Sequence, residues 1–67
     1  MFETKAFKIE LIRYGLTITQ IAKHLGVARS TVSQIINNFY QGKEIRGRLI
    51  RMLGAMQAGK FTRLEDY

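Results

Sequence analysis

Residues 15–37 constrain this chain most, because they contain two short helical patterns with a glycine between them. In the first pattern the apolar positions fall at i, i+1 and i+4 and share one face: Ile21, Ala22 and Leu25. In the second they fall at i, i+3 and i+4: Val32, Ile35 and Ile36. Gly26 lies between the patterns, where a left-handed conformation would let the chain leave the first helix. The stretch therefore predicts two short helices joined by a tight turn.

Two short helices joined in this way form a helix-turn-helix, whose second helix enters the major groove of DNA. Ala22 falls where two steeply crossing helices must approach closely, and its small side chain allows that approach. Val32 and Ile35 would pack back onto the first helix. The spacing thus favours a DNA-binding motif over residues 17–37.

The motif resembles the helix-turn-helix of the lambda repressor/Cro superfamily. The shared features are an Ala four residues before the turn glycine, a Val six residues after it and an apolar residue three further on: Ala22, Gly26, Val32 and Ile35. The following segment, 37–54, looks like the small Ner-like phage and bacterial regulators. The resemblance covers about residues 5–56. It implies an all-α, compact, lambda-repressor-like DNA-binding domain of four or five helices.

Length and composition agree with one small domain spanning 1–67. The 67 residues contain no Cys and one His, so we expect no disulfide, metal site, cofactor or small-molecule ligand, and no enzyme. A core of this size gains from self-association, which makes a homodimer plausible. No apolar run exceeds three residues, so we expect no membrane span or export signal and a cytoplasmic, nucleoid-associated location. From this length we expect no separate effector domain.

The charge is concentrated in the middle of the chain. Eleven Lys and Arg against five Asp and Glu give a net charge of +6. Between Leu11 and Arg63 the only acidic residue is Glu44, whereas nine residues are basic. This distribution favours a polyanionic partner, and nucleic acid before a membrane surface.

A first helix is expected over 4–14, with Thr4 as a candidate N-cap and Gly15 ending it. Its core stripe is expected at Phe7, Leu11 and Tyr14, widened by Ile9 and Ile12. Thr17 begins the second helix with a capping box to Gln20. His24 is expected on the outer, solvated face of that helix.

The recognition helix is expected over 29–37. Its outward residues are polar and lack Lys and Glu, which suits base reading in the major groove: Arg29, Ser30, Ser33, Gln34 and Asn37. Arg29 can pair with guanine and Gln34 with adenine. The alternative for this face is an ordinary solvated helix surface. Ala28 has no side chain that can cap this helix. Ser30 could supply the cap instead, one turn in.

Phosphate contacts are expected on both sides of this helix. The resemblance directs the start of the preceding helix and the loop after the recognition helix toward the DNA backbone. The candidates are Thr17, Thr19, Gln20, Thr31, Tyr40 and Lys43. Thr17, Thr19 and Gln20 could cap the helix and touch phosphate at once, whereas the alternative for Tyr40 is partial burial against the fourth helix.

The remaining segments are expected to complete the core. Asn38 suits a left-handed residue after the recognition helix, and Phe39 is expected to fill the core. A fourth helix over 44–57 has an apolar face: Ile45, Leu49, Met52, Leu53 and Met56. The tail, 58–67, contains a capping-box pattern at Thr62. Its apolar residues either pack under the domain or mediate self-association.

The sequence as a whole predicts a double-stranded DNA-binding regulator of transcription that represses by occluding a promoter, as a homodimer. Two other classes stay open. One is a DNA-binding protein with another function, such as an antitoxin, an excisionase or a recombinase-accessory protein. The other is a protein-docking module that has lost DNA binding. RNA binding is disfavoured, because few aromatic residues fall on the expected reading face.

Overall fold

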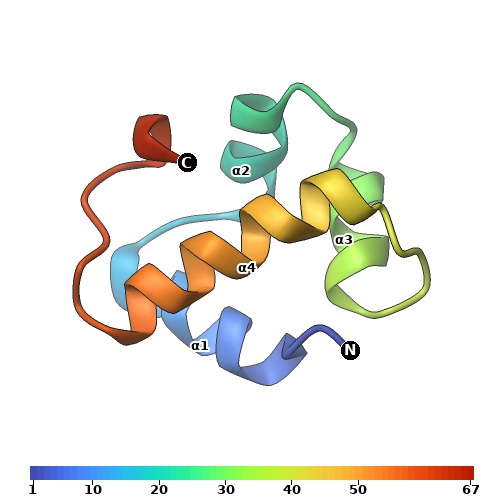
Figure 1. Cartoon of the computed structure of the whole chain (residues 1–67). Helices are drawn as coiled ribbons and strands as arrows, with labels where there is room; N and C mark the ends of the chain where they lie inside the picture. The colour runs from blue at the N-terminus through green and yellow to red at the C-terminus, as the bar shows by residue number, and fades with distance from the viewer.

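The computed structural model describes residues 1–67 and is all-helical, as expected. The elements are α1 (Thr4–Tyr14), α2 (Ile18–Leu25), α3 (Arg29–Ile36), α4 (Lys43–Gln57) and a terminal 3-10 turn, η1 (Leu64–Asp66). α2 packs on α3, and α4 runs across the molecule in contact with both α1 and α3 (Figure 1). No helix combines the length and the apolar character needed to cross a membrane.

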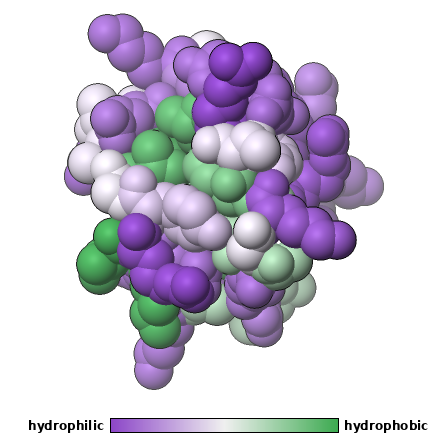
Figure 2. All heavy atoms as spheres, turned by 90° about the vertical axis from the view of Figure 1, so that its left-hand side faces the viewer, coloured by the Kyte–Doolittle hydropathy of each residue, from purple (hydrophilic) through white to green (hydrophobic).

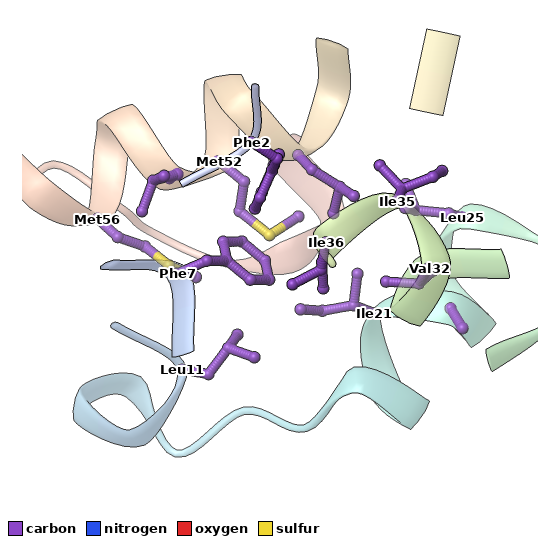
Figure 3. Packing of buried hydrophobic residues seen from close by; sticks show 13 residues of the cluster. Phe2, Phe7, Leu11, Ile21, Leu25, Val32, Ile35, Ile36, Met52 and Met56 are labelled. Atoms are coloured by element: carbon purple, nitrogen blue, oxygen red, sulfur yellow. The ribbon is translucent and has the colours of Figure 1, made fainter. Parts of the chain in front are cut away.

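One apolar core joins all four α-helices. Phe7 of α1 lies at its centre, with Met52 and Met56 of α4 on one side and Ile36 of α3 on another (Figure 3). Phe2, which precedes α1, is also buried, and its ring meets that of Phe7 edge-on at 5.2 Å. The core therefore extends to the residues before the first helix.

The first helix has the expected bounds, but its cap and its stripe differ. Glu3 is the N-cap residue and makes no side-chain cap bond. Thr4, the predicted cap, instead donates its hydroxyl to the carbonyl oxygen of Ile36. Ile9 and Ile12, predicted to widen the buried stripe, are 57% and 81% exposed. Both predictions were wrong because α1 packs on α4 through one narrow face, and its first turn is tied to the end of α3.

The turn chemistry between α1 and α3 follows the prediction. The Thr17 hydroxyl accepts from the Gln20 amide at 3.2 Å, and the Gln20 side chain accepts from the Thr17 amide at 2.8 Å, which completes the capping box. Gly26 ends α2 with φ 72°, a conformation that costs a residue with a Cβ atom roughly 1 kcal/mol or more. Ala28 begins α3 without a side-chain cap, and Ser30 makes no capping bond in its place.

An asparagine joins the end of α3 to the N-terminal segment. Asn38 has φ 64°, as predicted for a left-handed residue. Its side-chain oxygen accepts from the Phe2 amide at 2.6 Å, and its side-chain nitrogen donates to the Phe2 carbonyl at 3.1 Å. We call this pair of bonds the Asn38 clasp. It holds residues 1–4 against the end of α3, which the sequence pattern did not indicate.

Phe39 was predicted to fill the core, and that prediction was wrong. Its side chain is 84% exposed. Phe2 already supplies the aromatic ring beside Phe7, and the left-handed turn at Asn38 directs the next residue away from the core. The Phe39 amide meanwhile donates to the Gln34 carbonyl at 2.8 Å, which closes the end of α3.

The tail folds back onto the domain. The rings of Phe61 and Tyr67 stack at 5.3 Å, and Tyr14 meets Phe61 edge-on at 5.1 Å. Arg48 donates to the main-chain oxygen of Tyr67 at 3.0 Å. η1 packs against α2, but the predicted capping box is absent, because the Thr62 hydroxyl bonds the Asp66 carboxylate rather than the backbone.

The Asn38 clasp leads to a stability prediction. Asn38→Gly keeps the left-handed backbone and removes the two hydrogen bonds of the clasp, each worth about 0.5–1.5 kcal/mol, together with a longer 3.5 Å contact to the Thr4 hydroxyl. We expect the free energy of unfolding in urea to fall by about 1–3 kcal/mol. Asn38→Ala should be less stable still by about 1 kcal/mol, because Ala resists this conformation. Equal stability of the wild type and Asn38→Gly would show that the clasp contributes nothing.

Candidate nucleic-acid interface

The orientation of α3 follows from the burial of its apolar face. Val32, Ile35 and Ile36 have no solvent exposure, so the opposite face of this short helix must point outward. On that face Ser30 and Gln34 are exposed, whereas Arg29 is exposed because it begins the helix, beside α1 and α2; none of these three side chains hydrogen-bonds within the chain. A helix surface with free polar groups of this kind can bind the edges of base pairs.

The other two predicted base-reading residues, Ser33 and Asn37, are hydrogen-bonded to each other. The Asn37 side-chain amide donates to the Ser33 carbonyl at 2.9 Å and lies 3.4 Å from the Ser33 hydroxyl. Both side chains are half-buried, and Asn37 is the C-cap residue of α3 rather than its last helical residue. The structure thus divides the predicted set into three free side chains and one hydrogen-bonded pair.

A groove of about 390 Å³ lies where the starts of α2 and α3 meet α1. It brings Arg29 together with Thr17 and Thr19, which the sequence analysis placed in separate roles. Lys8 of α1 also lines it, although the sequence analysis assigned Lys8 no role. The sequence signal for Lys8 was weak, since a Lys on the polar face of a helix is ordinary. Only the tertiary structure, in which Lys8 lines the same groove as Thr17, Thr19 and Arg29, shows that its charge lies near the motif.

The other residues predicted to bind phosphate differ in their exposure and in whether their side chains are already hydrogen-bonded. Thr17 and the side-chain oxygen of Gln20 are used in the capping box, whereas Thr19 is exposed and makes no hydrogen bond. Thr31 is half-buried. Tyr40 and Lys43 lie beyond the other end of α3, both exposed. The candidates therefore flank α3 at both of its ends rather than forming one cluster.

The start of α3 offers main-chain donors as well. The first bonded amides are those of Thr31 and Val32, which donate to the Ala28 carbonyl. The amides of Arg29 and Ser30 precede them and have no backbone acceptor, because no helical turn comes before them, and Ala28 supplies no side-chain acceptor either. Exposed amides at a helix start attract an anion. The missing cap, which costs helix stability, leaves these donors free.

The charge near the motif is mainly uncompensated. The two ion pairs of the structure, Arg13–Glu10 and Arg63–Asp66, use acids of α1 and of the tail. Glu44, in the first turn of α4, is the one acid near the basic residues there. Lys8, Arg29, Lys43 and Arg46 take part in neither ion pair. On the face that carries the tail, strongly hydrophilic side chains lie mainly around the edge, while less polar and hydrophobic side chains occupy the middle and the lower left (Figure 2).

His24 does not lie free in solvent as predicted. The residue is half-buried, and its Nε2 atom is buried without a hydrogen-bond partner. The tail packs against α2 through η1, so the outer face of α2 is partly covered. No group of His, Asp and Glu side chains in the structure is arranged to hold a metal ion.

Comparison with known proteins assigns the chain to a family. A model of the homeodomain-like domain matches residues 8–48, which include most of α1, all of α2 and α3, and the first turns of α4. Searches of curated proteins and of solved structures gave no significant match. The matched residues cover more than half of the chain, and the helix-turn-helix predicted from the sequence falls within them. The chain belongs to the homeodomain-like family of helix-turn-helix DNA-binding domains.

Proposed function

We propose that this protein is a sequence-specific double-stranded DNA-binding regulator of transcription that reads the major groove with α3. The observation that carries the proposal is the free polar surface of α3: Ser30 and Gln34 on the face opposite the core, and Arg29 at the start of the helix, are exposed and their side chains are unbonded. Short polar side chains let a helix approach the base edges closely; Arg offers two parallel donors, and Gln offers one donor and one acceptor. Ser33 and Asn37 are secondary base contacts, because the Asn37 amide would have to leave Ser33.

The groove between α1, α2 and α3 supports a defined docking pose. Lys8, Thr19 and the free amides at the start of α3 would hold phosphates on one side of the recognition helix. Thr17, Gln20 and Thr31 stay candidates on the same side. The Tyr40 hydroxyl and the Lys43 ammonium group would bind phosphates on the other side. Contacts at both ends fix the register of α3, which base reading requires.

We further propose that the protein acts as a homodimer and as a repressor, by covering a promoter from a cytoplasmic, nucleoid-bound position. A two-fold dimer would bind half-sites about 34 Å apart on a near-palindromic operator. The resemblance to the lambda Cro-like and Ner-like regulators supports this part of the proposal.

Selection of binding sites from a pool of randomised duplex DNA tests the proposal directly. Enrichment of an inverted repeat is expected, and its spacing measures the dimer geometry. Enrichment of a single half-site would support sequence-specific DNA binding and contradict the symmetric dimer. No enrichment, with binding that disappears at moderate salt, would reduce the interaction to charge attraction.

Arg29→Ala should weaken binding to the selected site by about 1–3 kcal/mol and relax specificity at one base pair. Gln34→Ala should do the same at a different base pair. Affinities for the selected site and for its single-base variants check both expectations. An equal loss on selected and random DNA would remove Arg29 from base reading. Ile9→Ala, an exposed change outside the motif, serves as the control.

Lys43→Gln should lower the affinity for all DNA sequences by the same factor, because an ammonium group bound to a phosphate does not contact a base. The slope of log K against log salt should become shallower by about one. Titrations at several salt concentrations measure it. An unchanged slope would place Lys43 off the DNA.

Two threonines at the start of α2 separate folding from binding. Thr17→Ala removes the cap and should lower the free energy of unfolding by about 1 kcal/mol. Thr19→Ala should leave stability within about 0.5 kcal/mol, since Thr19 is exposed and unbonded, and should weaken DNA binding. Urea unfolding and DNA titration of both variants provide the comparison. Unchanged binding by Thr19→Ala would contradict its phosphate contact.

A further inference from the structure

The loop between α3 and α4 exposes two aromatic rings beside the recognition helix. Phe39 is 84% exposed and Tyr40 is 54% exposed. They line a cavity of about 260 Å³, which we call the loop pocket, together with Met1, Asn38, Gln41 and Arg46. Large exposed apolar side chains clustered in a concave surface indicate a contact site.

The structure holds this loop in place from both sides. The Asn38 clasp ties its start to Phe2, and the Phe39 amide is bonded to the Gln34 carbonyl. At its end, a Cβ atom added to Gly42 would lie 2.6 Å from Ile35 Cδ1 and 3.1 Å from Tyr40 Cε2. The Tyr40 ring thus lies close against the loop backbone, where only glycine fits. The rings are presented to solvent on a fixed support.

The chemistry of the loop pocket combines ring faces with polar and positive groups. Gln41 contributes an amide, and Arg46 contributes a guanidinium group that takes part in neither ion pair of the structure. An apolar protein segment placed here would remove that charge from water without a partner, which is costly. A nucleotide offers a flat ring to stack, groups for the amide and a phosphate for the guanidinium. Charge complementarity thus favours a nucleic-acid strand as the occupant.

We propose that the loop pocket binds one unpaired nucleotide of the DNA that α3 contacts, by stacking its base on Phe39 and Tyr40. This inference rests on the proposed function, because α3 brings the loop to the DNA. A base inside a duplex is covered on both faces by its neighbours, so an unpaired base presents a ring face to Phe39 without the cost of unstacking a base step. The pocket lies beyond the C-terminal end of α3, which places the nucleotide at one flank of the contacted duplex. The protein then recognises a duplex adjoining a bulge, a mismatch or a single-stranded end.

The test compares affinities for three forms of one duplex. The first is fully paired, the second carries one unpaired nucleotide at successive positions along each flank, and the third carries an abasic residue there. We expect about tenfold tighter binding when an unpaired base lies at one flank, and no such gain from the abasic residue. A mixed-sequence duplex serves equally well, so the result does not depend on a selected site.

Substitutions test whether the gain in affinity comes from the exposed aromatic ring of Phe39. Phe39→Ala should abolish the preference and leave affinity for the paired duplex unchanged, whereas Phe39→Trp should keep both. Ile9→Ala, which removes an exposed side chain lining neither cavity, should behave as the wild type. The fluorescence of 2-aminopurine at the unpaired position gives a second readout, since stacking should quench it with the wild type and not with Phe39→Ala.

Several results would overturn the inference, and they differ from failure of the proposed function. An equal gain from the abasic residue would show that duplex flexibility, not stacking, causes it. An equal loss on all three duplexes in Phe39→Ala would place the ring on the sugar–phosphate backbone. Altered sedimentation of free Phe39→Ala, without any preference in the wild type, would make the loop a protein contact. Absence of binding to every DNA would reject both proposals.

Discussion

The burial of one face of α3 is the constraint on which the interface depends. A helix of eight residues has little stability by itself and requires tertiary packing. Val32, Ile35 and Ile36 are fully buried, and each such side chain contributes about 1.5–3 kcal/mol on leaving water. Because helical geometry fixes the angle between side chains, seating these three also fixes the direction of Arg29, Ser30 and Gln34. The core positions the reading face and stabilises the fold through the same contacts.

A domain of 67 residues has a small core, and this one enlarges it with both ends of the chain. Phe2 enters the core beside Phe7, and the Asn38 clasp holds its backbone. At the other end Phe61 and Tyr67 stack beside Tyr14. The two additions act at different places. The first supports the end of α3 and the loop pocket, whereas the second covers part of α2.

The interface also depends on what the protein leaves unsatisfied. The start of α3 lacks a side-chain cap, several cations near the motif take part in neither ion pair, and two aromatic rings stand in solvent. Each feature costs some stability in the free protein. Each becomes favourable when a phosphate or a base supplies the missing partner. This common logic connects the proposed duplex contact with the proposed nucleotide pocket.

Local patterns in the sequence were sufficient for the helices and their turns. The bounds of α1, the capping box at Thr17, the left-handed residues Gly26 and Asn38, and the buried face of α3 all follow from periodicity and short-range hydrogen bonding. These features involve residues at most a few positions apart, so the sequence alone determines them. The polar composition of the reading face was visible for the same reason.

Tertiary structure decided every feature that depends on residues distant in the chain. Thr4 bonds Ile36 instead of capping α1, and Ile12 stays exposed because α1 packs through one narrow face. Phe2 takes the place expected for Phe39, and Lys8 joins the groove at the start of α2. A sequence pattern shows which residues are apolar or charged, but competition for the same space is settled only when the helices pack. The helix-turn-helix was therefore determined locally, whereas the clasp, the loop pocket and the position of Lys8 were determined by packing.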